Sequence, residues 1–206
     1  PRPSKLSLRG ECYNFSLSRG IQEHIKKLAD AAKVPLLAVW LAAYFILLYR
    51  YSNRNDILVP FPIAGRDRRF DEVCGYFANL LPIRAQISPT ITFFSFLQQV
   101  SQTLKESMTH RNYPFPLMLK EVEWAKQRWA KEGSALFASA SFDWQNYSGF
   151  LSTSCNDLPL AVSSGDAGEV WNLSSEIQWK RLPFRKQWDE FYLQLNIINL
   201  PCHQHG

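Results

Sequence analysis

The segment that decides the fold reads IAGRDRRFDEVCGYFANLLPIR and covers residues 63–84. Two apolar runs, ILVPFPIA and YFANLLPI, lie on either side of the charged turn GRDRR, which predicts two strands joined by a polar connection. Asn79 lies within the second run and Arg84 lies at its end, so each side chain needs a protein partner or a wet cavity. Two interpretations stay open at this point. Either both residues belong to a cavity wall, or Asn79 caps a bend and Arg84 simply leaves the core.

Composition and charge narrow the class of protein. The 206 residues are enough for one domain of ordinary size, which is also the length of one lobe of a two-lobed enzyme. The net charge of +5 would favour an acidic partner, but it is too small to indicate nucleic acid. The four cysteines are far apart, which indicates free thiols in a reducing compartment and predicts a cytoplasmic protein. The opening PRPSK has no leader character, and we expect it to follow a cut within a longer polypeptide.

Two helices are predicted before the hairpin. Apolar residues at helical spacing indicate a surface helix over residues 19–33, with Ser18 as its cap and His24 at the border of its apolar stripe. A second helix covers residues 35–51 and is apolar throughout residues 36–49. A bilayer needs about 20 apolar residues, so this shorter run predicts a helix buried on all sides in a protein core rather than a membrane span.

The rest of the chain alternates between helix and strand patterns. Strands are predicted over residues 57–64, where Pro60 and Pro62 indicate an edge or a bulge, and over residues 78–86. Thr92 is the expected cap of the next helix, and His110 caps its end. Period-two patterns predict strands over residues 136–144 and 171–180, and residues 117–130 are predicted to be helical. The expected inner face of the helix after Thr92 consists of Phe93, Leu97, Val100, Leu104 and Met108.

The order of these motifs resembles a known family. AGRD followed by GYFANLLPIR is similar to the carboxyl half of the condensation domains of nonribosomal peptide synthetases. The upstream run LLAVWLAAYFILLYRYSNRNDILV resembles the long core helix and following strand of that family, and FFSFLQQV, HRNYPFP and LFASASFDWQN follow in the family's order. The resemblance covers residues 1–145 well and fades afterwards. It implies an α/β fold: a chloramphenicol acetyltransferase-like lobe, with a mixed sheet packed with helices, over residues 1–180, and a divergent tail over residues 181–206.

The resemblance implies amide formation. The amine of an acceptor on one carrier protein attacks the thioester of a donor on another, and both arrive on phosphopantetheine arms. The expected partners are an amino-terminal lobe, peptidyl carrier proteins and an adenylation domain, with no directly bound cofactor, nucleic acid or membrane. Asn79, Arg84, Arg66 and Tyr76 are the tunnel-lining or structural candidates.

Catalytic histidines are not expected in this chain. The family's His-His-x-x-x-Asp-Gly motif belongs to the amino-terminal lobe, and no two histidines of this chain are adjacent. We therefore expect no catalytic residue here and no activity from the chain alone. Cys202, His203 and His205 have the chemistry of metal ligands, but the cluster lacks a fourth ligand and predicts no metal site.

Three alternative functions are weighed against this one. An epimerisation domain shares the fold but would show a Gly-Trp-Phe-Thr-like stretch in place of GYFANLLPIR, so Asn79 favours condensation. A plant-type acyltransferase would carry Asp-Phe-Gly-Trp-Gly, which this sequence lacks. The third alternative is a non-catalytic module that binds carrier proteins or a partner chain.

Overall fold

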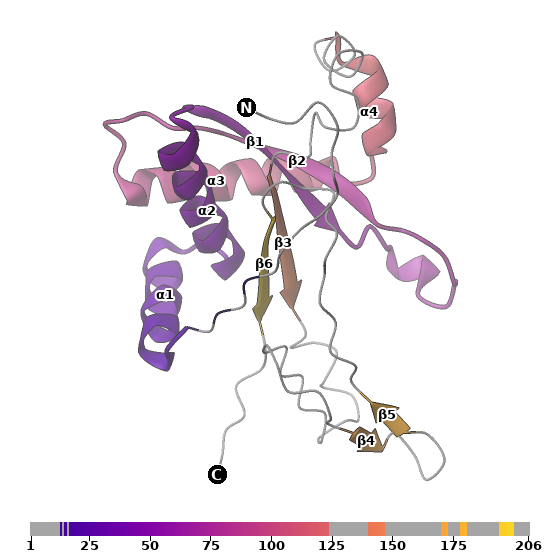
Figure 1. Cartoon of the computed structure of the whole chain (residues 1–206). Helices are drawn as coiled ribbons and strands as arrows, with labels where there is room; N and C mark the ends of the chain where they lie inside the picture. The colour runs from indigo at the N-terminus through magenta and orange to yellow at the C-terminus, as the bar shows by residue number, and fades with distance from the viewer. Residues whose placement is uncertain are drawn as a thin grey trace. The chain divides into compact units, whose positions relative to one another are not determined.

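A computed structural model describes Tyr13, Phe15 and residues 17–123, 140–146, 170–172, 178–180 and 194–199. The chain divides into two units. One consists of Arg19–Asp143 with Phe191–Leu195, and the other of Pro1–Ser18, Trp144–Glu190 and Asn196–Gly206. The first unit contains the hairpin and the helices that position the candidate site (Figure 1).

The predicted hairpin is present. Strand β1 (Asp56–Ile63) pairs with β2 (Asn79–Gln86) in an antiparallel register that places Pro60 opposite Pro82 and Ile63 opposite Asn79. Every second residue of β2 from Leu81 to Ala85 is buried, as expected for a strand with one face in a core. Among the described strands, β1 pairs only with β2, so β1 is an edge strand within the described part of the chain. An edge strand tolerates proline, which explains Pro60 and Pro62.

Three helices build the core with this hairpin. Helix α3 (Phe93–Thr109) contacts β2 and α2 (Leu36–Ser52), and α2 also contacts β1 and α1 (Arg19–Ala32). Figure 1 shows α2 and α3 beside the two strands. The largest fully buried side chains come from several elements and pack as one core: Tyr44, Phe45, Phe96, Phe142, Leu41, Ile83 and Leu97.

Helix α2 differs from the prediction that it is buried on all sides. Six of its residues between Ala38 and Phe45 are buried, but Ala43 is exposed and Leu47 is 42% exposed. The reason is geometric, because among the described elements α1, α3 and β1 contact α2 from only part of its circumference. No single helix of the described residues has the length and apolar character to cross a membrane, although α1 and α2, bent by 104°, meet that criterion as a pair.

The start of α3 confirms the predicted cap. The Thr92 hydroxyl accepts a hydrogen bond from the backbone N–H of Ser95 at 3.2 Å, which satisfies one of the donors left free at a helix start. The inner face was assigned partly wrongly, since Phe96 is buried whereas Phe93 is 37% exposed. The buried face of α3 therefore begins at Phe96 and not at Phe93.

We expect Thr92→Ala to lower the free energy of unfolding by about 1 kcal/mol, because the helix loses its capping acceptor. Thermal unfolding of the variant measures this loss as a decrease in Tm of about 2–4 °C. Thr92→Ser keeps the hydroxyl and is the matched control. A serine variant as unstable as the alanine variant would contradict the capping role.

The remaining elements revise two further predictions. Helix α4 (Phe115–Glu121) ends at the extended residue Val122, which interrupts the helix predicted over residues 117–130; Glu123 is again helical, and residues 124–130 lie outside the described part. Strand β3 (Ser141–Asn146) pairs with β6 (Gln194–Asn199), which lies in the predicted tail. The strand predicted over residues 171–180 is instead two antiparallel strands, β4 (Val170–Asn172) and β5 (Gln178–Lys180).

The aromatic core explains why β3 packs here, and it also reveals a buried hydroxyl. The Phe142 ring lies 5.8 Å from that of Tyr44 and 6.1 Å from that of Phe61, between centroids. Burial raises the pKa of Tyr44 well above its ordinary value. The side chain of Ser141 is also buried, and among the described residues its hydroxyl has no hydrogen-bond partner.

Candidate functional site: a hairpin turn, an amide clasp and a cavity

Arg66 organises the charged turn between β1 and β2. Its Nη1 donates to the carbonyl oxygens of Phe70 and Val73, the latter at 2.6 Å, and its Nη2 donates to that of Gly75 at 3.4 Å. Its guanidinium also lies 4.3 Å from the centroid of the Phe77 ring, within the range of a cation–π interaction. A single side chain therefore holds the backbone of this turn at three points, which is the structural role left open for Arg66.

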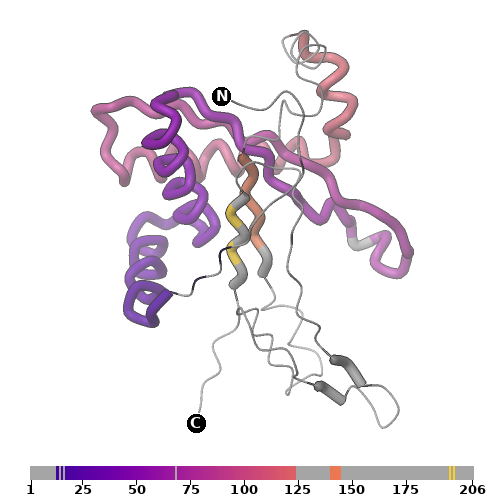
Figure 2. The backbone as a smooth tube through the Cα atoms, in the orientation of Figure 1, coloured from indigo at the N-terminus to yellow at the C-terminus, as the bar shows by residue number. Residues whose placement is uncertain are grey.

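Gly65 supplies the conformation that the turn needs. Its φ of +58° lies in the left-handed region, and a Cβ added there would collide with the carbonyl oxygen of Phe77. The turn thus requires glycine at this position for two independent reasons. Figure 2 shows residues 64–78 as a segment that extends beyond the paired strands.

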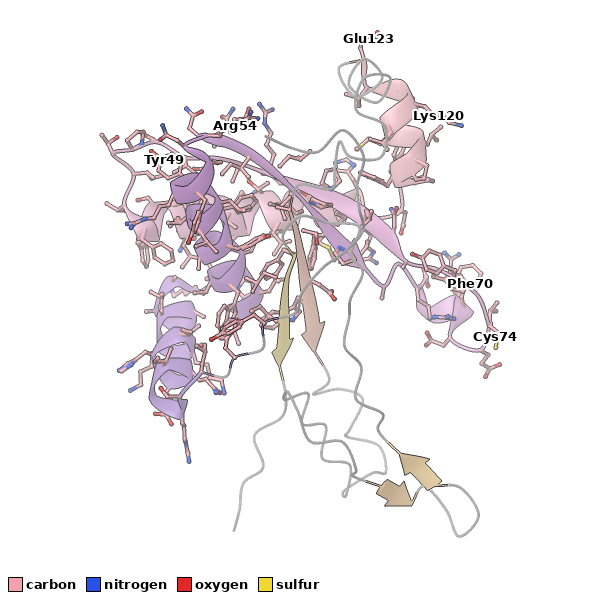
Figure 3. All side chains as sticks on the ribbon, in the orientation of Figure 1. Tyr49, Arg54, Phe70, Cys74, Lys120 and Glu123 are labelled. Atoms are coloured by element: carbon pink, nitrogen blue, oxygen red, sulfur yellow. The ribbon has the colours of Figure 1, made fainter. Side chains whose placement is uncertain are left out.

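The far end of this turn exposes apolar side chains. Tyr76 is 92% exposed, and Phe70 and Val73 are also exposed. Figure 3 labels Phe70 and the exposed Cys74 near the end of the segment. Tyr76 therefore contributes to the surface of this unit, and its assignment to a tunnel wall stays a prediction.

Asn79 forms a clasp between β2 and the segment that joins α3 to α4. Its Nδ2 donates to the backbone carbonyl oxygens of Arg111 at 3.0 Å and Tyr113 at 2.8 Å. Its Oδ1 accepts from the backbone N–H of Phe115, the first residue of α4, at 3.1 Å. The amide is therefore satisfied by protein groups, as the second interpretation of this residue requires.

A cavity of about 310 Å³ lies next to this clasp. Strand β2 lines it with Leu80, Leu81 and Pro82, and the α3–α4 segment contributes Tyr113 and Phe115 among other residues. The lining is mainly apolar, and its volume is at the lower end of the range of small-molecule sites. The Tyr113 hydroxyl donates to Glu121, and this hydrogen bond raises the pKa of Tyr113 above its ordinary value.

Arg84 forms a two-point ion pair with Asp56 of β1. Its Nε and Nη2 lie 2.8 and 2.7 Å from the two carboxylate oxygens, and both side chains are about half exposed. Since Asp56 is opposite Gln86 in the hairpin, Arg84 reaches it diagonally across the strands. Hydrogen bonding to Arg84 holds the pKa of the Asp56 carboxyl below its ordinary value of 3.8.

Asn79 and Arg84 leave β2 on opposite faces. Five positions separate them, and successive side chains of a strand alternate between its faces. Asn79 is on the face of the buried residues Leu81 and Ile83, and Arg84 is on the other. The expectation that both line a cavity between two lobes stays a prediction.

We expect Asp56→Asn to lower stability modestly at neutral pH, because a screened surface pair is replaced. The folded-state pKa of Asp56 is depressed, so its contribution is present well above pH 3.8 and is lost as the pH falls below that value. Urea unfolding of wild type and variant from pH 7 to pH 2.5 measures this. The free energies of unfolding of wild type and Asp56→Asn should become equal towards pH 2.5.

The matched control for this pair is Asp71→Asn, which removes an exposed carboxylate that forms none of the ion pairs described here. The free energy of unfolding of Asp71→Asn should differ little from that of wild type across the same pH range. A wild-type advantage over Asp56→Asn that persisted unchanged at pH 2.5 would contradict the ion pair as its source.

The histidines of the described residues form no catalytic arrangement. His24 is exposed on α1, and His110 lies at the C-cap of α3, where its backbone N–H contacts the Ser107 carbonyl, which confirms the predicted cap. His110 also lines the cavity. No group of three metal-ligating side chains occurs in the described ranges, and Cys202, His203 and His205 lie outside them.

Sequence reasoning missed the partners of the candidate residues. Asp56 could have been found, because a hairpin closed around the GRDRR turn brings it within diagonal reach of Arg84. The carbonyl oxygens of Arg111 and Tyr113 could not, since they lie 32 and 34 residues beyond Asn79 and backbone groups carry no sequence signal.

Comparison with known proteins identifies the family. The family model described as "Condensation domain" matches residues 1–163. N-(5-amino-5-carboxypentanoyl)-L-cysteinyl-D-valine synthase from Amycolatopsis lactamdurans is 29% identical over 84% of this chain, which spans only 5% of that synthase. The condensation domain from Monacolin K polyketide synthase MokA is 27% identical with a TM-score of 0.55, over 65% of this chain and 31% of that one.

A second solved structure shares the fold over more of the chain. A four-domain nonribosomal peptide synthetase bound to AMP and glycine superposes with a TM-score of 0.72 and 22% identity, over 95% of this chain and 14% of that one. The helices and strands described above are thus those of the chloramphenicol acetyltransferase-like α/β fold that the family resemblance implied. The chain belongs to the condensation-domain family of nonribosomal peptide synthetases.

Proposed function

We propose that this chain is the carboxyl-terminal lobe of a condensation domain that forms an amide bond between two carrier-bound substrates. The observation that carries the proposal is the family match over residues 1–163, which contain the whole hairpin and clasp. The chain covers 31% of the similar condensation domain from MokA, which supports its assignment as part of a larger domain.

In this proposal the acceptor amine attacks the donor thioester carbonyl. The C–N bond forms, the C–S bond breaks, and the donor's phosphopantetheine thiol is released on its carrier protein. The amine must lose a proton, and a positioned base is worth about 10²–10⁴-fold in rate. We assign this base to an amino-terminal lobe, because the described histidines are an exposed helix residue and a helix cap.

The contribution of this chain is then architectural. It would provide one wall of the substrate tunnel and surface for the amino-terminal lobe, the peptidyl carrier proteins and the adenylation domain. The test is single-turnover amide formation from loaded donor and acceptor carrier proteins, with and without an amino-terminal lobe that carries the His-His-x-x-x-Asp-Gly motif. Product from this chain alone would contradict the assignment of the base.

A non-catalytic binding module is the second candidate. The observation that favours it is the exposed apolar end of the turn between β1 and β2, with Phe70, Val73 and Tyr76 at the surface. In this case the chain would bind loaded carrier proteins, and no added amino-terminal lobe would produce amide. Carrier binding without turnover in the reconstituted mixture would identify this second function.

A further inference from the structure

Asn79 makes contacts that a residue lining a cavity does not need. The nitrogen and the oxygen of its amide both bond main-chain groups of one short segment, residues 111–115, which lies more than 30 positions away in the sequence. A side chain that served to contact substrate would leave at least one polar atom directed at the solvent or the ligand. This arrangement instead is that of a structural tie.

The tie replaces a helix cap. Helix α4 begins at Phe115 after Pro114, which makes no side-chain capping hydrogen bond. The N–H groups of the first turn of a helix need acceptors, and the Oδ1 of Asn79 accepts from the first of them. The Nδ2 of the same amide donates to the carbonyl oxygens of Arg111 and Tyr113, so the segment that leads into α4 is also fixed to β2.

The tie also borders the cavity. Leu80 and Leu81 follow Asn79 directly in β2, while Tyr113, Phe115 and Met118 belong to the segment that Asn79 holds. Each of these residues lines the cavity. The three hydrogen bonds of this one side chain therefore link the β2 wall of the cavity to its α4 wall.

We propose that Asn79 is a positioning residue, which clasps the start of α4 to β2 and thereby sets the width of the cavity between them. The clasp is a property of this chain and does not depend on the proposed function. Its effect on amide formation does rest on that function, so the two are measured separately.

The chain provides an internal probe of the cavity wall. It contains two methionines, Met108 in α3 and Met118 in α4, and only Met118 lines the cavity. In the full chain labelled with ¹³C-methyl methionine, Asn79→Ala should shift or broaden the Met118 signal and leave the Met108 signal in place. Loss of three hydrogen bonds should also speed amide exchange at Phe115 by about tenfold.

The matched control is Asn112→Ala. Asn112 lies within the clasped segment, is exposed, and makes none of the hydrogen bonds described for that segment. It should leave both methionine signals and the exchange rate unchanged. Unchanged Met118 and Phe115 signals in Asn79→Ala, or equal changes in both variants, would overturn the proposal.

Asn79→Asp gives a readout that general destabilisation cannot mimic. The introduced carboxylate keeps the acceptor for Phe115 but turns a second oxygen towards the carbonyls of Arg111 and Tyr113, and the repulsion between these oxygens raises the pKa of the carboxyl above its ordinary value. Protonation restores one donor. The Met118 signal should therefore return towards its wild-type position as the pH falls from 7 to 4 in Asn79→Asp, and not in Asn79→Ala.

Other titratable groups face the same region, and their effect on the pH dependence of the Met118 signal must be subtracted. They are His110, Arg111, Tyr113 and Glu121, all present in wild type and in both variants. A Met118 signal in Asn79→Asp that follows the wild-type pH profile with a constant offset would overturn the clasp.

The rate of amide formation tests whether the clasp affects the proposed reaction. In the reconstituted domain we expect Asn79→Ala to reduce the single-turnover rate by about tenfold, the loss that a misplaced wall causes, and Asn112→Ala to have no effect. A normal rate in Asn79→Ala together with the Met118 shift would confine the clasp to stability and would overturn its link to the reaction. Absence of amide product in wild type would contradict the proposed function. The methionine signals would still show whether Asn79 clasps α4 to β2.

Discussion

A domain assembled from this chain and an amino-terminal lobe that carries His-His-x-x-x-Asp-Gly is expected to form amide product in a single turnover, whereas this chain alone is expected to form none. The expected difference is the largest of those predicted here, because the proposed function assigns both the positioned base and the preorganised site to the amino-terminal lobe. His24 lies on the exposed face of α1, and His110 ends α3. The other two histidines, His203 and His205, follow the end of the family match at residue 163.

The decisive control is an amino-terminal lobe in which the second histidine of the motif is replaced by alanine. It should associate with this chain as the unmodified lobe does, but the rate should fall by about 10²–10⁴-fold. Rapid quenching and mass spectrometry of the carrier-bound product measure both rates. Equal product from the modified and unmodified lobes would show that the base comes from elsewhere, and product from this chain alone would place it here.

The hairpin was predicted from the sequence to within one residue, and the reason is physical. The predicted strands at residues 57–64 and 78–86 correspond to β1 (Asp56–Ile63) and β2 (Asn79–Gln86). Both are short apolar runs that end at polar or glycine-containing stretches, so local sequence alone defines where pairing can start and stop. The helices α1, α2 and α3 were predicted equally well, because α1 and α3 carry apolar residues at helical spacing and α2 is a continuous apolar run between polar breaks.

Burial was harder to predict because it depends on what packs against an element. The pattern of α3 permits Phe93 or Phe96 on the inner face, and its packing against β2 and α2 decides in favour of Phe96. The uniformly apolar α2 has no pattern that would indicate which side faces its partners, and Leu47 proves to be exposed. Period-two alternation over residues 171–180 cannot reveal a chain reversal, and the register pairs Trp171 with Trp179.

The candidate site was predicted as a set of residues but not as a set of contacts. Asn79 and Arg84 were selected because polar groups in or beside apolar runs need partners, whereas Arg66 and Tyr76 were named only through the family resemblance. The structure shows those partners to be backbone carbonyls for Arg66, the start of α4 for Asn79, and Asp56 for Arg84. The expectation that they are tunnel-lining is independent of these contacts and stays a prediction.

Gly65→Ala is expected to destabilise the chain by at least about 2 kcal/mol, because any residue with a Cβ is strained at φ +58° and the added methyl group meets backbone rather than a movable side chain. Thermal unfolding should show a decrease in Tm of about 4–8 °C. Gly20→Ala is the matched control. Gly20 lies near the start of α1, and no described residue has an atom within 4 Å of a Cβ placed there, so this substitution should stabilise the helix by up to about 0.5 kcal/mol.

The turn itself reports the effect of Gly65→Ala most directly. To relieve the collision with the Phe77 carbonyl, the backbone at Gly65 must move, and the adjacent Arg66 then loses its alignment with the carbonyls of Phe70, Val73 and Gly75. The arginine-rich GRDRR turn should become a preferred site of tryptic cleavage in native buffer, at a rate well above that of wild type and of Gly20→Ala. If cleavage within this turn stayed at the wild-type rate while Tm fell, the strain would be released elsewhere in the hairpin, and the role assigned to Gly65 in shaping the Arg66 turn would be wrong.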